Sequence, residues 1–421
     1  MTEPTFGISF LRDDNEPRPA VTADMSVVGL FGPMADAQDG IPINRAITFN
    51  SDDTSVLNAL GSNDVADAVR GINDQLADFQ RAARVVLVRT PASTSADPAT
   101  KINENIGSAV GTQAEGSGMY GLLKAGPALG VIPRLIACPG LTGHQTAVNE
   151  ANLICASLPG VLAKLMAVAA VDGPANSLQG FTNWRETMQS ERLIPIETAV
   201  KAGNADGTTS VRPASGRILG VAVRRDFEKG GFPFHSWANQ PVQGIAGPNR
   251  PIDYSLTDGA TEGQEILAMN GGVIVRGEMG VDTAISDSGF VFIGTDTCSA
   301  DTLWQFYNQV RGRDFIHLMF LRTLRYYLGR FNITGHAIQS VLNTMSFALR
   351  DLKADEHILG YTVGFTKDKN SPENIRKGRF CVRFAAEEPP VFRHLTIQSA
   401  RYREALNAML DDLLTQLELA A

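Results

Sequence analysis

Short apolar runs that alternate with amphipathic segments constrain the fold of this chain more than any other feature. Four runs read as buried strands: Arg84–Arg89, Gly130–Gly140, Leu165–Pro174 and Arg192–Val200. They are rich in branched residues, and three of the four end in or run into a Pro or Gly turn. Segments with helical spacing separate them, over residues 62–82, 144–163, 181–189 and 212–226. This alternation predicts a layered α/β core with largely parallel strands.

Changes in texture divide the chain into four expected parts. Residues 1–20 are polar and punctuated by proline, which is typical of an arm. Residues 21–275 form the expected α/β domain, which begins with a strand over Val21–Gly32 and carries a surface linker at about 90–118 with at most one weak helix. Residues 276–398 form an expected α+β C-terminal domain, and residues 399–421 an amphipathic helix.

The C-terminal domain combines long helices with a few short strands. Helices are expected at Thr302–Val310, Asp314–Phe331 and Thr334–Leu352, and a last one at Ser399–Leu419. Strands are expected at Ile358–Phe365, Arg379–Phe384 and His394–Gln398. Three short strands bury little by themselves, and no later strand covers their edges.

Composition argues against several classes of function. The 421 residues are 43% hydrophobic and 19% charged, and the net charge of −8 disfavours a direct nucleic-acid partner. The longest apolar run, Leu158–Val171, is too short to span a membrane and contains Lys164. The N-terminus shows no signal peptide. We therefore expect a soluble protein made in a cytoplasm, with no membrane insertion.

Enzymatic motifs are nearly absent. Gly116, Gly118 and Gly121 match GxGxxG, but a polar linker precedes them where a dinucleotide site needs a strand, so a flexible turn is favoured. There is no GxSxG, P-loop or HExxH. Asp172 follows a buried strand and is the best candidate for chemistry, although a turn-forming or capping role is favoured. We expect no catalytic residue, cofactor or metal.

The histidines and cysteines show no ligand spacing. His317 and His336 lie on mostly apolar helical segments, where a core or interface role is favoured. The four cysteines lack any CxxC pair. They allow two interpretations, namely buried thiols or disulfides that form between subunits outside a reducing cell. The cysteines are Cys138, Cys155, Cys298 and Cys381.

Five arginines cluster around one helical segment, and within it only Asp314 opposes them: Arg311, Arg313, Arg322, Arg325 and Arg330. Because many neighbouring residues are large and apolar, the segment must be mostly buried and the charges must form a stripe. A stripe on a packed helix fits an acidic protein surface at least as well as phosphate.

The ordered set of these motifs resembles the tail sheath proteins of contractile bacteriophage tails and related injection systems. The segment Gly360–Gln398 carries the strongest likeness, with strand, polar connector, strand, Pro389-Pro390 and strand in the family's order. Other segments follow in order along most of the chain: Pro133–Gly140, Val161–Pro174, Arg212–Gly247 and Trp304–Phe320. The long helix Ser399–Leu419 departs from the pattern, since family members often end soon after the last strand.

The resemblance implies a structural function. Similar proteins polymerise helically around a tail tube and contract to drive the tube through the host cell envelope. The implied partners are further copies of the chain, the tail tube protein, and baseplate and tail terminator proteins. The implied location is the virion tail, assembled in the bacterial host cytoplasm. Two alternatives remain, a bacteriocin-like or other contractile injection system and, more remotely, an α/β enzyme using Asp172.

The resemblance also implies assembly sites. The C-terminal domain would serve for polymerisation, with extended terminal arms that add strands to neighbouring subunits. The arginine stripe would face the tube, and the cysteines are candidates for links between subunits. The expected strand-exchange residues are Phe6, Ile8, Phe10, Ile358, Tyr361, Val363, Phe380, Val382, Phe384, Leu395 and Ile397.

Overall fold

A six-stranded, mostly parallel sheet organises the computed structural model, which describes residues 22–204 and 207–420. The strand order is β2-β3-β1-β4-β5-β6, and only β2 runs antiparallel to its neighbour. This confirms the mixed α/β class and the largely parallel core. The strands are β1 Val28–Pro33, β2 Ala46–Asn50, β3 Arg84–Thr90, β4 Leu135–Ala137, β5 Val168–Asp172 and β6 Leu193–Ile196.

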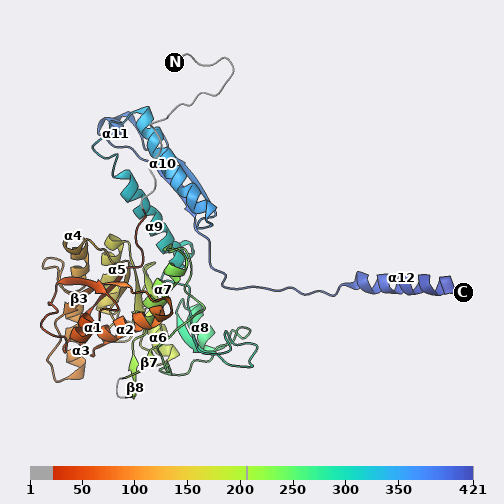
Figure 1. The fold of residues 1–421 in the computed structure, drawn as a ribbon, viewed down its shortest axis with the longest axis horizontal. Helices are drawn as coiled ribbons and strands as arrows, with labels where there is room; N and C mark the ends of the chain where they lie inside the picture. The colour runs from red at the N-terminus through yellow and green to blue at the C-terminus, as the bar shows by residue number, and fades with distance from the viewer. Residues whose placement is uncertain (1–21, 205–206, 421) are drawn as a thin grey trace, which may run out of the picture. The chain divides into compact units, whose positions relative to one another are not determined.

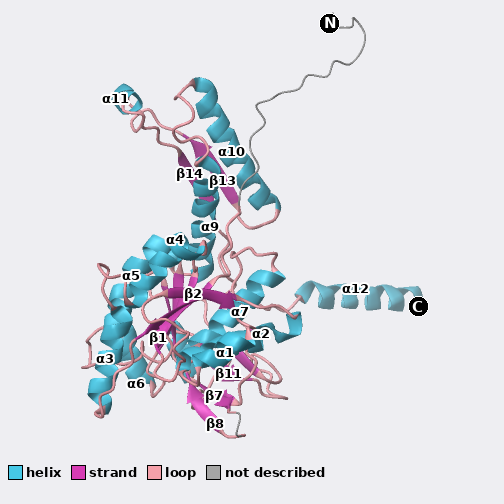
Figure 2. Cartoon of the chain, turned by 60° about the vertical axis from the view of Figure 1, so that its left-hand side comes forward, coloured by secondary structure: helices cyan, strands magenta, loops and turns pink. Residues whose placement is uncertain are grey.

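Helices cover both faces of this sheet, because alternate residues of each buried strand point to opposite sides. Leu30, Leu87 and Ala170 pack on the face that carries α1, α2 and α7. Phe31, Val88 and Val171 pack on the face that carries α3, α5 and α6. Figure 2 shows the strands between these two groups. The helices are α1 Thr54–Leu60, α2 Asp64–Leu76, η1 Ala77–Phe79, α3 Pro98–Val110, η2 Gly118–Lys124, α4 Ala125–Leu129, α5 Leu153–Leu165, α6 Leu178–Arg185, α7 Ser215–Glu228 and α8 Glu262–Ala268.

Capping residues decide where several helices begin, and two expectations change as a result. Asn152 accepts hydrogen bonds from the N–H groups of Ile154 and Cys155, so α5 begins nine residues later than the periodicity at 144 indicates. The linker expected at 90–118 contains the 13-residue α3, which Asp97 caps and which buries Ile106 against the sheet. Small residues hid this helix, because Ala and Gly contribute little to an apolar stripe.

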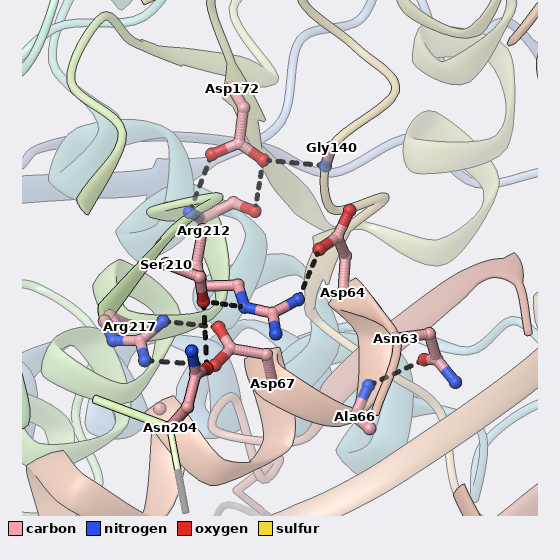
Figure 3. A network of polar contacts seen from close by, with 12 residues as sticks. Asn63, Asp64, Ala66, Asp67, Gly140, Asp172, Asn204, Ser210, Arg212 and Arg217 are labelled. Atoms are coloured by element: carbon pink, nitrogen blue, oxygen red, sulfur yellow. Dashed lines mark hydrogen bonds and ion pairs between the residues drawn. The ribbon is translucent and has the colours of Figure 1, made fainter. Parts of the chain in front are cut away.

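The contact between α2 and α7 is close because glycines form it. A Cβ on Gly216 would lie 2.5 Å from the Cα of Ala68. The guanidinium of Arg217 reaches across the contact and donates to both carboxylate oxygens of Asp67 at 2.7 and 3.3 Å. Figure 3 shows this pair beside the Arg212–Asp64 pair. This buried ion pair holds the two helices in one register, because separating it would leave a buried charge without a partner.

Two small antiparallel sheets flank the core, and the sequence did not predict their pairing. One has the order β10-β7-β8 and the other β11-β12-β9. The antiparallel hairpin β7–β8 pairs Val200 with Arg212, and Figure 1 shows it at the lower edge of the core. The strands are β7 Val200–Gly203, β8 Thr209–Arg212, β9 Gln240–Pro241, β10 Gly247–Pro248, β11 Val273–Arg276 and β12 Phe290–Ile293.

A third packed cluster joins α9, α10 and a two-stranded sheet, β13–β14. The expected helices at 302–310 and 314–331 are instead a short turn and one helix, α9, which ends at Leu324. The expected strand Arg379–Phe384 begins at Arg383 and continues to Glu387. Figure 2 shows α10 beside the two strands. The elements are η3 Thr302–Trp304, α9 Tyr307–Leu324, α10 Gly335–Ala354, β13 Gly360–Gly364, α11 Pro372–Arg376 and β14 Arg383–Glu387.

The residues from Val391 onward form a separate unit. Its regular element is the helix α12, Arg403–Ala420, which confirms the helix expected near Ser399–Leu419. The strand expected at His394–Gln398 is not formed in the described chain. A single strand without a partner leaves its backbone groups unpaired, so that prediction depended on a second chain. No helix in the part that the structure describes is long and apolar enough to cross a membrane.

Candidate assembly interface

The sheet β13–β14 consists of two strands, and each has one edge without a partner strand in the described chain. Tyr361 pairs with Ala386, and Val363 pairs with Phe384. One face packs on α9 and α10, where Phe384 lies 5.1 Å from the ring of Phe320. Two strands alone are marginally stable, and open edges pair readily with further chains. Both edges of this sheet thus leave room for a further strand to pair.

The expected strand-exchange residues fall into three groups. Phe6, Ile8 and Phe10 lie outside the described residues. Leu395 and Ile397 belong to the unit after Val391 and are 74% and 83% exposed. The remaining six lie at or near β13–β14. Ile358 is fully buried and the other five are partly buried. The six are Ile358, Tyr361, Val363, Phe380, Val382 and Phe384.

A folded connector joins the two strands, and one asparagine holds its ends together. Asn370 donates to the carbonyl of Cys381 at 2.8 Å and accepts from the N–H of Cys381 at 2.7 Å. The rings of Phe365 and Phe380 meet at 5.5 Å just inside these contacts. The sequence showed the connector as polar, but it gave no sign of this closure, which fixes Cys381 beside the open sheet.

The structure separates the five arginines. Arg311 is 1% exposed and binds Asp226 through two hydrogen bonds of 3.1 and 2.6 Å. Arg313 binds both carboxylate oxygens of Glu388 at 2.8 Å. The expectation of a free charge that faces a partner is therefore wrong for Arg311, and for the partly exposed Arg313 it stays a prediction. Their acidic partners lie 85 and 75 residues away, so the sequence around them could not reveal the pairs.

The other three arginines lie at the far end of α9 and in the turn after it. Arg325 and Arg330 are exposed, and the Arg330 guanidinium lies 5.0 Å from the ring centroid of Tyr326. Arg322 is half-buried and donates to the carbonyl of Thr22. Large apolar side chains stand exposed among them, including Leu321 and Leu328. This end of the helix offers a mixed cationic and apolar surface.

Asp314, the single acid expected to oppose the stripe, has a different partner. Its carboxylate accepts two hydrogen bonds from Arg192, at 2.5 and 3.0 Å. Arg192 lies immediately before β6, so this pair ties α9 to the central sheet. Three successive charged residues of α9, namely Arg311, Arg313 and Asp314, thus form ion pairs with three other parts of the fold.

Three of the four cysteines are buried: Cys138, Cys155 and Cys298. Burial raises the pKa of the Cys298 thiol to about 12 and raises those of the other two as well. Such thiols are unreactive and cannot reach a neighbouring subunit, so the interpretation as buried thiols fits these three. Cys381 is exposed and remains a candidate for a link between subunits.

Asp172 caps a helix. Its carboxylate accepts from the Ser215 N–H at 2.8 Å and from the Ser215 hydroxyl at 2.6 Å. It also accepts from the Gly140 N–H at 3.5 Å (Figure 3). Burial raises its pKa to about 6, against these hydrogen bonds, which lower it. Both oxygens are occupied at the first turn of α7, which fits the capping role that the sequence favoured.

The remaining motifs do not form a reactive site. The GxGxxG residues follow α3 and open η2, without the preceding strand that a dinucleotide fingerprint needs. His235 and His357 lie 5.7 Å apart beside Phe234, and burial lowers the pKa of both, that of His235 to about 4. In the described part of the chain no three His, Cys, Asp or Glu side chains gather as a metal site would require.

Comparison with known proteins gives one consistent result, although no family model matches the chain. The tail sheath protein of Escherichia phage P2 is 23% identical over 405 residues, which covers 94% of this chain and 96% of that protein. The major tail sheath protein of Serratia phage KSP20 is 22% identical over 418 residues, covering 94% and 95%.

Solved structures share the fold over nearly the whole chain. The PVC sheath complex of an extracellular contractile injection system, in its contracted state, matches with a TM-score of 0.65 and 15% identity, covering 96% of this chain and 100% of that chain. A chain of the anti-feeding prophage baseplate matches with a TM-score of 0.60 and 14% identity, covering 95% and 99%.

Proposed function

The chain belongs to the contractile tail sheath protein family, and we propose that it polymerises helically around a tail tube and contracts to drive the tube through a cell envelope. It is a structural protein, and no enzymatic step is part of this role. The observation that carries the proposal is the open sheet β13–β14 in a chain whose sequence likeness spans 94% of its length.

The assembly mechanism follows from the open edges. We infer that residues 1–20 and the stretch 391–398 leave their own subunit and add strands to β13–β14 of neighbouring copies. Main-chain hydrogen bonds would then supply the affinity between neighbouring subunits. Such head-to-tail contacts do not close into a ring and so generate a helical polymer. In this proposal residues 276–398 act as the polymerisation domain.

The free energy of contraction can come from burial between subunits. An additional ~400 Å² of apolar surface buried per subunit is worth roughly 10 kcal/mol before ordering costs. Summed over many subunits, this is enough to drive a tube. The extended state is then a kinetic trap that tube and baseplate contacts hold.

We place the tube-facing surface at the exposed end of α9, with Arg322, Arg325 and Arg330 against an acidic tube protein. Replacing Arg325 and Arg330 by Glu should prevent assembly on isolated tubes, and neither side chain is used to hold the described N-terminal segment. Arg350→Glu is a matched control, because this exposed arginine lies on α10. Normal assembly of the double variant on tubes would contradict the placement.

The remaining partners and the location follow the same proposal. Baseplate and tail terminator proteins would cap the two ends of the sheath, in a virion tail assembled in the bacterial host cytoplasm. A bacteriocin-like particle or other injection system is the second candidate, since phage relatives and injection-system folds both match.

Negative-stain electron microscopy of the overexpressed chain tests the function. We expect tubes of sheath-like diameter from the full chain, and monomers from chains lacking residues 1–20 or 391–421. Circular dichroism and thermal melting of the shortened chains supply the control, because their compact unit should stay folded. Tubes from both shortened chains would refute strand exchange, and globular particles from the full chain would refute the sheath.

A further inference from the structure

Helix α9 holds the first described residues of the chain. The carbonyl of Met25 accepts a hydrogen bond of 3.2 Å from Arg311, and the carbonyl of Thr22 accepts one from Arg322. The hydroxyl of Ser26 donates at 3.0 Å to Asp226, the carboxylate that pairs with Arg311. The segment 22–26 is thus bound at both of its ends to side chains that α9 supplies or pairs with.

The same helix holds the last residues of the compact unit. Arg313 binds Glu388 through two bonds of 2.8 Å and donates to the carbonyl of Ala386 at 2.6 Å. Gln309 donates to the carbonyl of Glu388 at 3.1 Å, and Asn308 to that of Pro389 at 3.2 Å. Every one of these contacts lies at or before the point where the second unit begins, after Pro390.

Helical geometry sets Arg313 on the side of α9 opposite to Arg311 and Arg322. Arg311 and Arg322 are eleven residues apart, which is about three turns, so they project from nearly the same face. Arg313 lies about 200° around the axis from Arg311, whereas Asn308 lies about 60° from it. The salt bridge of Arg313 therefore holds the C-terminal segment on the face opposite to the two arginines that hold the N-terminal segment.

The geometry points to α9 as the helix that transmits force between the chain before Thr22 and the chain after Pro390 in each subunit. A pull on the chain before Thr22 reaches α9 through Arg311 and Arg322, and a pull on the chain after Pro390 reaches it through Arg313. The force can then cross α9 between the two ends of the subunit, and the pair of Asp314 and Arg192 also ties this helix to the central sheet. This consequence rests on the proposed polymerisation, whereas the anchoring is a property of the single chain.

Burial explains why these anchors resist a pull. The side chains of Arg311 and Asp226 are 1% and 2% exposed, and the Arg311 guanidinium lies 5.1 Å from the ring centroid of Trp237. Separating the pair would leave two uncompensated charges in an apolar site. The anchor of Arg313 is less buried but has a bidentate geometry, which resists displacement in any direction within its plane.

Hydrogen exchange of the soluble full chain tests the anchoring. Arg313→Gln should reduce amide protection about tenfold or more in residues 384–388 and leave residues 22–27 unchanged. Arg322→Gln should reduce amide protection in residues 22–27 and leave residues 384–388 unchanged. Arg350→Gln removes an exposed arginine from α10 and should change neither segment. Unchanged protection in both variants, or equal loss in both segments, would overturn the anchoring.

Shear of assembled tubes tests the load path. Tubes of the Arg313→Gln chain should break into severalfold shorter pieces than tubes of the wild type or of Arg350→Gln, as measured by electron microscopy after brief sonication. Equal lengths would overturn the role of α9 in transmitting force. Absence of tubes in the wild type itself would count against the proposed function, and the exchange experiment would still decide whether α9 anchors both ends.

Discussion

The central sheet and the sheet β13–β14 differ in how far helices and further strands cover them. Helices cover both faces of the central sheet, and strands such as β1 and β5 are buried along most of their length. In β13 and β14, by contrast, only Ala386 is fully buried. Burial explains stability in the first region, whereas our proposal assigns strand exchange to the exposed backbone edges in the second. In that proposal different regions hold the subunit together and join it to others.

Removal of a large buried side chain beside the central sheet should have the largest effect. Trp184 is fully buried on α6, and its indole N–H donates to the carbonyl of Thr142 at 2.8 Å. Trp184→Ala should lower the free energy of unfolding by about 3–5 kcal/mol, measured by urea denaturation. Phe392→Ala, at a position 93% exposed, is the control and should change it by less than about 0.5 kcal/mol. A similar loss of unfolding free energy in both variants would contradict the distinction between buried and exposed regions.

Added bulk between α2 and α7 should have the next largest effect. Gly216→Ala places a methyl group 2.5 Å from Ala68 and should cost about 1–3 kcal/mol. Gly107→Ala is the matched control, because this exposed glycine in α3 has open space around it. There the same substitution should stabilise by about 0.5–1 kcal/mol through helix propensity. Thermal melts of both variants should therefore shift in opposite directions, and a shared direction would show that the contact is not tight.

The stability of the fold should depend on pH through Asp172, the residue that caps α7 at the edge of the central sheet. The pKa of Asp172 is raised in the folded chain to about 6 from 3.8, so the folded state binds its proton more tightly than the unfolded state does. Its contribution to stability is present below pH 4 and is lost as the pH rises through 6. Relative to Asp172→Asn, the wild type should thus lose about 1–3 kcal/mol between pH 4 and pH 7. A trend of opposite sign, or equal pH dependence in the wild type and Asp172→Asn, would refute the burial argument.

Loss of the exposed thiol should have the smallest effect on folding. Cys381→Ser should change the free energy of unfolding by less than about 0.5 kcal/mol, because the side chain is exposed. Non-reducing gels of assembled particles test its second role. Disulfide-linked multimers, if Cys381 forms them, should vanish in Cys381→Ser and persist in Cys298→Ser. Monomer alone in wild-type particles would dismiss the link.

The sequence predicted the regular parts of the fold because local patterns encode them. Val65, Val69 and Ile72 lie on the helix that their spacing indicated, and Arg84–Arg89 lies within β3. The strand at His394–Gln398 is absent because strand formation needs a partner, which a pattern within one chain cannot supply. The pairing of the two small antiparallel sheets was not predicted for a related reason, since β9 and β10 are two residues long and owe their pairing to distant strands.

The candidate interface was predictable in position but not in detail. The order of strand, connector and strand located β13 and β14. The arginine stripe was misjudged at Arg311, and the ion pair of Arg313 was not foreseen, because Asp226 and Glu388 are their neighbours only in the folded chain. Charge pattern along a helix identifies a face, but it cannot tell a free cation from one already paired.

The hairpin β7–β8 has a practical consequence for engineering. Among the described residues β8 pairs only with β7, and its residues alternate between exposed and partly buried. The backbone N–H of Asn204 donates to the carbonyl of Thr208 at 2.7 Å, so the strands meet again beyond Gly203. A foreign peptide inserted between these two residues would leave every paired residue of the hairpin in place. Each copy of the chain could then display an epitope or a binding tag at a defined and repeated spacing.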